Sequence, residues 1–415
     1  MSGIKRLRRV QFFKEATATK GTIGLATSVQ RVTGTVDDQR VMHFPDEDIG
    51  YLVDVERVSN PYKFAVLEIE EAPATFEQLG YHLCAGIKRL DTAVADAGTG
   101  DIWTFPFSYV EPVNDFSTYT IEAGDNEEME ILPYAYLKSF KLSGRPKLPI
   151  MFSGTYEARQ AERLKLAIAD AAFATPANTV TPTVAGQFAG ANNFPNGSNI
   201  RIEGATLAAN NGLKTVVSCT DDVLTVTETL ANQAAEAVTI QQDFTEAAAL
   251  PNVEDILFSK AALSIGPDTG AFGDGAMTAL MMSFDLEVET GIQARPAASG
   301  QLYFPRAALV NPSIRLMMTL EWNGDSSDEK QLWKDGGHAG RLIRIQSLGS
   351  ALATAGAHTY KTLRIDVAGQ WEKFDKIGED NGNDIVDVTF RGQYNTTEAA
   401  YSTIVLVPDS LNALP

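Results

Sequence analysis

The sequence predicts a mainly β protein made of two similar halves, with a small β-domain inserted between them. Three observations lead to this prediction. Stretches rich in β-branched and aromatic residues, bounded by Gly, Pro, Asn or Asp, run through most of the 415 residues. Similar segments recur in the same order on both sides of the insert. Residues 175–247 differ in composition from everything around them.

The strands are predicted from these stretches and from the turns between them. Asn-Gly pairs begin at Asn196, Asn211, Asn323 and Asn381, and such pairs favour turns because they accept positive φ at low cost. The principal strands are expected at residues 64–70, 134–142, 149–156, 281–288, 314–322, 362–367 and 385–394.

Two helices are predicted with a defined start. The first covers residues 75–84, where the leading threonine can cap the helix and the apolar residues share a face. The second covers residues 326–334, where Ser326 and Glu329 have the spacing of a capping box and Gly336-Gly337 would end the helix.

The predicted insert, residues 175–247, contains no Trp and no Tyr, and its only basic residues are Arg201 and Lys214. It opens with a Pro- and Thr-rich run that is typical of a linker. We therefore expect a small β-domain inserted into a larger one. Residues 159–172, just before it, have a helix-favouring content of Ala, Leu and Glu but follow directly from a predicted strand, so their structure stays open.

The flanks of the insert indicate an internal duplication. An Asn-Pro pair precedes a strand, a short turn and a predicted helix twice, at Asn60-Pro61 and at Asn311-Pro312. A Phe-x-Gly-x-Tyr strand lies near the end of each flank, at 152–156 and 390–394, and a strand that ends in Gly precedes each. The predicted organisation is residues 1–174 as a first module with an N-terminal arm, 175–247 as the insert and 248–415 as a second module.

Charge and composition exclude several classes of protein. The chain has 53 acidic and 34 basic residues, a net charge of −19, so binding nucleic acid by neutralising its phosphates is not expected. No apolar run approaches the ~20 residues of a membrane span. The basic N-terminus lacks the apolar stretch of a signal peptide, so we expect the protein to be made and kept in a cytoplasm.

No motif in the sequence predicts catalysis, a cofactor or a metal ion. The four histidines do not have metal-ligand spacing, and His82 is expected to be a surface or partly buried residue of its helix. Cys84 and Cys219 are expected to be reduced packing residues. The acidic stretch 122–130 is interpreted as a solvated loop, the glycine-rich stretch 266–275 as a flexible loop, and 380–384 as an Asn-Gly hairpin without calcium.

A duplicated, acidic and strand-rich chain is typical of a protein that assembles. The stretches 41–50, 64–71, 74–87, 136–144 and 152–160, together with the closing run 363–407, resemble the major tail tube proteins of long-tailed (siphovirus) phages, of a duplicated type. The match is one of pattern and order over most of the chain outside the insert. The insert resembles the immunoglobulin-like domains that decorate such tubes.

This resemblance implies a fold and an assembly. Each module would be a β-sandwich with one helix, and six modules would close a ring whose inner strands form a β-barrel. Because one chain carries two modules, three chains would close the ring as a pseudo-hexamer; a ring of six chains is the alternative. Stacked rings would form the tail tube, which conducts DNA during ejection without specific binding.

The resemblance also implies partners and a location, namely tail terminator, tape measure and baseplate proteins in the virion tail. No catalytic, cofactor-binding or metal-binding residue is expected. Four basic residues of the N-terminal segment, which is expected to be mobile until rings stack, are candidates for contacts between rings: Lys5, Arg6, Arg8 and Arg9.

The wall of such a channel should repel phosphate. We expect Asp, Glu and small polar residues at alternate positions of the strands that line it, with residues 138–143 and 281–289 as candidates. Alternative hypotheses are another virion structural protein, such as a capsid decoration or baseplate component, a secreted carbohydrate-binding protein, and an enzyme.

Overall fold

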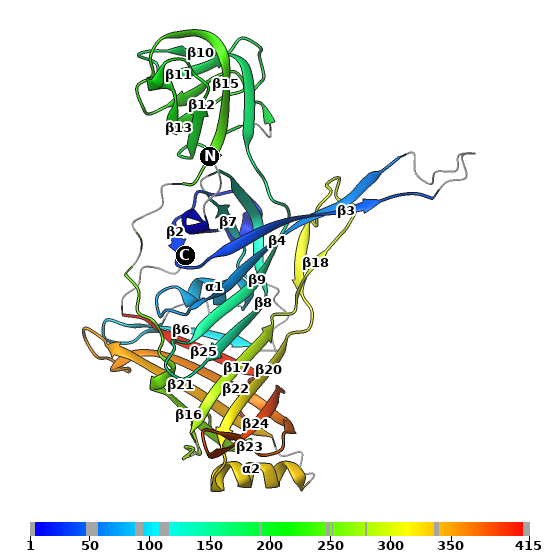
Figure 1. The fold of residues 1–415 in the computed structure, drawn as a ribbon, viewed down its shortest axis with the longest axis vertical. Coiled ribbons are helices and arrows are strands. Elements are labelled where there is room, and N and C mark those ends of the chain that lie inside the picture. The colour runs from blue at the N-terminus through cyan, green and yellow to red at the C-terminus, as the bar shows by residue number, and fades with distance from the viewer. Residues whose placement is uncertain are drawn as a thin grey trace.

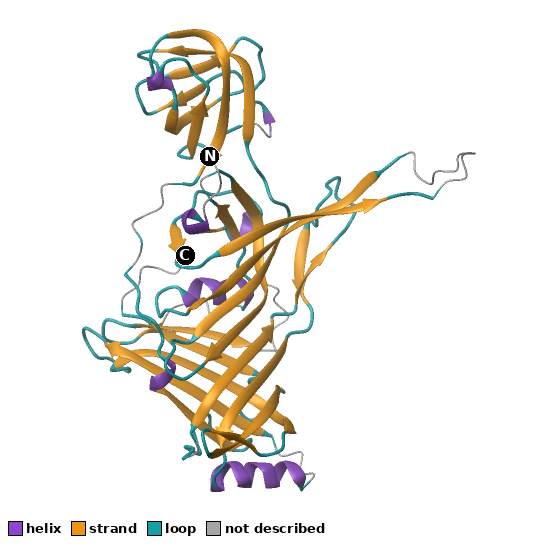
Figure 2. Ribbon diagram, viewed as in Figure 1, coloured by secondary structure: helices purple, strands orange, loops and turns teal. Residues whose placement is uncertain are grey.

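The computed structural model confirms a mainly β protein, in which a long β-rich body carries a small barrel at one end (Figures 1 and 2). Only two α-helices occur in the described part of the chain. The structure describes residues 5–46, 57–87, 94–107, 116–125, 127–190, 193–245, 250, 252–278, 280–335 and 340–409.

One continuous antiparallel sheet runs through the body, and four strands from each half of the chain contribute to it. In spatial order its strands are β3 (Gly34–His43), β4 (Ser59–Pro73), β9 (Met151–Ala158), β8 (Met129–Gly144), β17 (Met281–Glu289), β20 (Ser313–Glu321), β24 (Asn383–Gly392) and β22 (Tyr360–Phe374). We call this array the long sheet. The two halves of the chain meet where β8 pairs with β17.

Two long strands, β8 and β22, leave the long sheet and continue into a second layer. The first part of β8 pairs with β7 (Tyr119–Gly124), which pairs with β1 (Arg9–Lys14), and β1 also pairs with β2 (Ser28–Gln30). The first part of β22 lies between β21 (Arg341–Ala351) and β25 (Ser402–Val407). Beyond these lie β16 (Ala261–Pro267) on one side and β6 (Asp101–Phe107) with β5 (Val94–Ala95) on the other.

The same order of pairing occurs in both halves of the chain. In the first half β3 pairs with β4, β4 with β9, β9 with β8, and β8 with β7. In the second half β17 pairs with β20, β20 with β24, β24 with β22, and β22 with β21. A helix follows both β4 and β20.

A single hydrophobic core fills the space between the layers of both halves. Leu67 and Tyr156 in the first half and Leu316 and Phe390 in the second are fully buried. These residues alternate with polar ones along their strands, since successive side chains point to opposite faces. The long sheet therefore has one apolar face against the core and one polar face.

Both helices occur where the sequence predicts them, with corrected boundaries. α1 (Leu79–Gly86) begins later than expected, because the Thr75 hydroxyl accepts from the backbone N–H of Gln78 in a turn before it, at 3.2 Å. α2 (Gly324–Lys334) is capped by Asn323, not Ser326. The side chains of Asn323 and Ser326 each accept from the other's backbone N–H. The predicted stop at Gly336-Gly337 lies outside the described residues.

The insert is a closed six-stranded barrel, with the strand order β10-β11-β14-β13-β12-β15. Its strands are β10 (Lys165–Ala174), β11 (Thr179–Pro182), β12 (Asn199–Glu203), β13 (Gly212–Cys219), β14 (Leu224–Val226) and β15 (Gln233–Asp243). Phe173, Phe188 and Phe194 fill its interior.

The barrel corrects two expectations and answers one open question. It begins at Lys165, ten residues before the predicted boundary, because β10 closes the barrel against β15. The open question at residues 159–172 is thereby answered, since 165–172 belong to a strand. The six strands close on themselves instead of forming the two packed sheets of an immunoglobulin-like domain.

The remaining described elements are short. β18 (Ile292–Arg295) and β19 (Arg306–Leu309) form a separate hairpin, and β23 (Gly378–Asp380) pairs with the start of β24. The turn between β23 and β24 has positive φ at Asn381 (52°) and Gly382 (85°), which confirms the Asn-Gly hairpin. No helix in the described part of the chain is long and apolar enough to cross a membrane.

Candidate functional site

The face of the long sheet that points away from the core carries mostly polar side chains. Its side chains come from every second residue of neighbouring strands, in register across the junction of the two halves. Its polar members include Thr35, Asp37, Glu68, Ser139, Lys141, Ser153, Thr155, Asp285, Glu287, Glu289, Arg315, Thr319, Asp387, Thr389 and Arg391, and Val66 and Met317 are apolar members of the same face. Carboxylates outnumber cations, and hydroxyl groups occupy most of the other positions.

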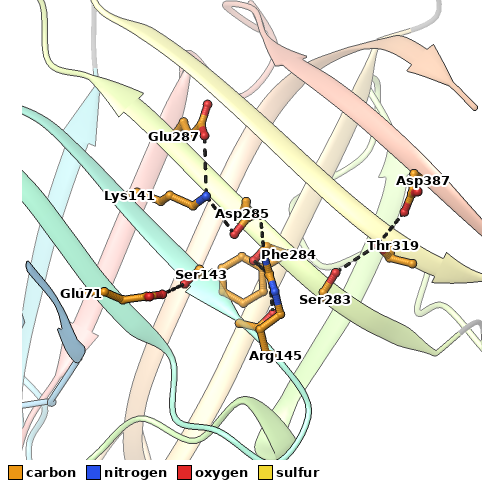
Figure 3. Close-up of polar contacts among 11 residues, drawn as sticks. Glu71, Lys141, Ser143, Arg145, Ser283, Phe284, Asp285, Glu287, Thr319 and Asp387 are labelled. Atoms are coloured by element: carbon orange, nitrogen blue, oxygen red, sulfur yellow. Dashed lines mark hydrogen bonds and ion pairs between the residues drawn. The ribbon is translucent and has the colours of Figure 1, made fainter.

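The junction between β8 and β17 carries a group of ion pairs (Figure 3). The ammonium of Lys141 lies 3.4 Å from the Asp285 carboxylate and 3.8 Å from that of Glu287. The Arg145 guanidinium donates to Asp285 at 2.7 Å. Both cations come from the first half of the chain and both carboxylates from the second. The cations at this junction are therefore neutralised within the face.

Hydroxyl groups continue the polar face on both sides of this junction (Figure 3). On the β8 side, Ser143 donates to Glu71 at 3.0 Å. On the β20 side, Ser283 donates to Thr319 at 3.1 Å, and Thr319 donates to Asp387 at 2.7 Å. Each of these hydroxyl groups can both donate and accept, and the three contacts link neighbouring strands across the face.

The strands at residues 138–143 and 281–289, which the sequence singles out, lie next to each other here. They are the paired parts of β8 and β17. The alternation of polar and apolar residues expected for them is confirmed along β17, where Asp285, Glu287 and Glu289 alternate with buried Phe284, Leu286 and Val288. Whether this face lines a channel stays a prediction.

Each end of the long sheet has an edge with no partner strand in the described chain. β3 pairs with β4 along one edge only. The last part of β22, from Trp371 to Phe374, pairs with β24 along one edge, and β21 stops opposite Gly369. Unpaired backbone groups on an edge strand can accept another strand.

The basic residues of the N-terminal segment lie on the surface of the first half. Lys5 pairs with Glu70 at 3.2 Å, Arg8 donates to the Thr35 hydroxyl at 3.4 Å, and Arg9 lies over the Phe244 ring at 5.1 Å. Arg6 is exposed. The structure does not bring the four side chains together into one site.

The expectation of a mobile N-terminal segment is wrong for β1. The backbone of β1 pairs with both β2 and β7, and Val10 and Phe12 are buried in the core. Alternation of apolar and polar residues over only six residues gave too weak a signal to predict this strand.

Two side chains that the sequence predicts to be at least partly exposed are fully buried instead. His82 stacks on Phe152 with ring centroids 4.5 Å apart, and its Nδ1 lies 2.8 Å from the Tyr156 hydroxyl. Burial lowers the pKa of His82 to about 3, so its imidazole is neutral. Glu122, expected in a solvated loop, lies on β7 and accepts from the backbone N–H of Thr245 at 2.9 Å, and burial raises its pKa.

No pattern in the sequence predicts the role of Glu15, whose carboxylate is buried within the first half of the chain. It accepts from the backbone N–H groups of Gly21 and Tyr134 and from the Thr118 and Thr120 hydroxyls, at 2.6 to 3.0 Å. These partners satisfy the carboxylate, so Glu15 supports the fold and offers nothing to a ligand.

The remaining chemical candidates add no site. Neither Cys84, which is buried, nor Cys219, which is half-buried, forms a disulfide bond. Among the described residues, no group of three or more His, Cys, Asp or Glu side chains is arranged to hold a metal ion. No protein-family model matches the chain, and no curated protein compared with it matches.

Proposed function

We propose that this protein is the structural subunit of a phage tail tube, as the sequence resemblance implies. The observation that carries the proposal is the long sheet, with a polar face on which carboxylates outnumber cations and an outer edge at each end. Copies joined edge to edge would extend this sheet around a ring, and closure would leave no edge exposed.

The chemistry of the polar face supports transport of DNA past it. A channel rich in unpaired Lys or Arg would hold phosphates, with an affinity that grows with each phosphate neutralised. Here Lys141 and Arg145 are paired with Asp285, and Glu68, Glu287 and Glu289 carry negative charge nearby. We propose that this face lines the channel and lets DNA slide without specific binding.

The repeated order of strand pairing supports the duplication. We propose that residues before and after the barrel form two tandem tail-tube modules, so that three chains close a pseudo-hexameric ring. The barrel would project outward from the tube. The four basic residues Lys5, Arg6, Arg8 and Arg9 stay proposed as contacts between stacked rings.

Electron microscopy of the purified full chain tests this proposal. Rings with an open centre, or tubes built of such rings, are expected. Isolated particles without a channel would favour the alternative, another virion structural protein such as a capsid decoration or baseplate component. A channel lined mainly by Lys and Arg in a map of the assembly would contradict the proposed passage of DNA.

A further inference from the structure

Each half of the chain extends a hairpin from the same pair of strands. We call residues 41–46 and 57–62, at the end of β3 and the start of β4, the first arm, and residues 291–311, which form β18 and β19, the second arm. In both arms the returning strand carries one extra residue near the base. It lies opposite the step from Val41 to His43 in the first arm and opposite the step from Glu289 to Ile292 in the second. The two arms are therefore counterparts.

Corresponding rows of paired residues relate the positions in the two arms. Each row crosses four neighbouring strands of the long sheet and ends where the register shifts, in β8 or in β22. The rows are Val36, Leu67, Tyr156 and Leu137 in the first half and Leu286, Leu316, Phe390 and Trp371 in the second. Val36 of β3 therefore takes the place of Leu286 of β17, and both side chains face the core.

The second arm packs against the first half of the same chain. Ile292 and Ala307 are buried, and Phe304 is fully buried. The Phe304 ring lies beside the rings of Tyr134 and Tyr136, with centroids 5.6 Å and 6.1 Å away. The backbone N–H of Ala307 donates to the Tyr134 hydroxyl at 3.2 Å. Apolar packing and hydrogen bonds together hold this arm on the first half.

Arg159 of the first half adds to the same contact. Its guanidinium donates to the carbonyls of Phe304, at 3.2 Å, and Pro305. It also lies over the Tyr303 ring, 5.5 Å from the centroid. This contact lies within one chain, so it shows how an arm and a half fit together.

The second half has a surface that corresponds to the one around Arg159. The backbone N–H of Arg159 donates to the carbonyl of Pro133 at 3.2 Å, and that of Gln393 donates to the carbonyl of Ala368 at 2.8 Å. Gln393 therefore takes the place of Arg159. Its side chain is exposed, and its amide can donate hydrogen bonds to carbonyls as the guanidinium does.

The first arm carries apolar side chains at the positions that are buried in the second arm (Figure 1). Counting along the strands from Val36 and Leu286, the counterparts are Met42 and Ile292, Phe44 and Ala294, and Val58 and Ala307. Met42, Phe44 and Val58 are 48%, 58% and 48% exposed. A group of large apolar side chains on one face of an exposed hairpin is typical of a contact surface.

We propose that the face of the first arm formed by Met42, Phe44 and Val58 docks on the second half of a second copy of the same chain, beside Gln393. The inference rests on the proposed function and assigns one of its interfaces. The occupant is a second copy because the contact would continue an interface that the chain already has. First and second halves alternate around the proposed ring, so the step that places the second arm on a first half recurs from each first half to the next chain's second half.

Replacing the exposed apolar side chains in the full chain tests the contact. Phe44→Ser and Val58→Ser should each lower the assembled fraction in sedimentation velocity about tenfold, because each removes an apolar side chain from the proposed interface. Urea unfolding should be unchanged, since both side chains are exposed in the single chain. Val184→Ser is the matched control, because Val184 is 56% exposed on the barrel, which has a core of its own, and this variant should assemble like the unmodified chain.

Photo-cross-linking identifies the occupant directly. A photoreactive benzoylphenylalanine in place of Phe44 should give cross-linked dimers in assembled particles, with the adduct in residues 366–374 or 390–396 of the second copy. Adducts on the barrel, on a first half or on another protein would overturn the proposal, and so would assembly of both serine variants at the unmodified level. An unmodified chain that never assembles would instead overturn the proposed function, and this interface with it.

Discussion

At the residue scale, the buried side chains of His82 and Glu329 each contribute to the stability of the fold. His82 is enclosed by Phe12, Phe152 and Tyr156, and its Nδ1 meets the Tyr156 hydroxyl. Glu329 of α2 accepts from Arg341 and from the indole N–H of Trp371, both at 2.9 Å. Each side chain is therefore a place where one substitution has a defined cost.

The folded chain should lose stability as the pH falls, because of His82. Its pKa is about 3 in the folded chain and about 6.5 when unfolded, so the unfolded state binds the proton more readily. The stability is fully present above pH 6.5 and is lost on acidification toward pH 3. Between pH 7 and pH 5 the loss should be about 2 kcal/mol.

Urea unfolding of His82→Phe at the two pH values measures this contribution. The variant should lack the histidine-dependent part of the loss, whereas His43→Phe, at an exposed position, should keep it. An identical pH dependence in His82→Phe and the unmodified chain would contradict the neutral, buried imidazole.

Replacing Glu329 by Ala should lower the free energy of unfolding by about 3 kcal/mol, since Arg341 and Trp371 would both lose a buried partner. Loss of a helix cap, the role that the sequence predicts for this residue, would cost about 1 kcal/mol. Chemical denaturation distinguishes the two values, and the exposed Glu379→Ala serves as the control.

At the scale of elements, the barrel is joined to the body at two adjacent points. The backbone N–H of Gln242, near the end of the barrel, donates to the carbonyl of Leu164 at its start, at 2.8 Å. Beyond the exit, Phe244 packs against Met129 and Ile131, and Thr245 donates to Glu122. The chain therefore enters and leaves the barrel at neighbouring points, and the residues after the exit are bound to the body by contacts that involve no barrel strand.

Removal of residues 165–243, with Leu164 joined to Phe244 by a short glycine linker, should leave the body folded. The core of the barrel shares no member with the core of the body. A cut at the sequence-predicted boundary, joining Ala174 to Ala248, should instead leave β10 without β15 and cause aggregation. Size-exclusion chromatography of both deletions checks this, and a folded second variant would contradict it.

These corrections show what local sequence can predict. Along β17 and β20, buried residues alternate with more exposed ones, and the sequence predicts the bounds of both strands closely. β10, rich in Ala, has no such signal, because its strand state depends on pairing with the distant β15. Likewise, the role of Glu329 depends on Trp371 in another strand, and the free edges are defined by which strands are missing beside them.

At the scale of the whole molecule, the two halves form one sheet and one core, so we expect them to unfold together. The same arrangement bears on stoichiometry under the proposed function. A ring should contain three chains, because each supplies both halves. Native mass spectrometry of single rings measures this, and six chains per ring would contradict the duplication even if tubes form.

The passage of β8 and β22 through both layers has a mechanical consequence. In an ordinary sandwich the two sheets are held together by side-chain packing, and they can slide past each other by repacking. Here a continuous backbone crosses from one layer to the other in each half, so sliding would have to break ladder hydrogen bonds. A load applied to one layer is therefore carried into the other through covalent bonds, which makes each half resistant to shear.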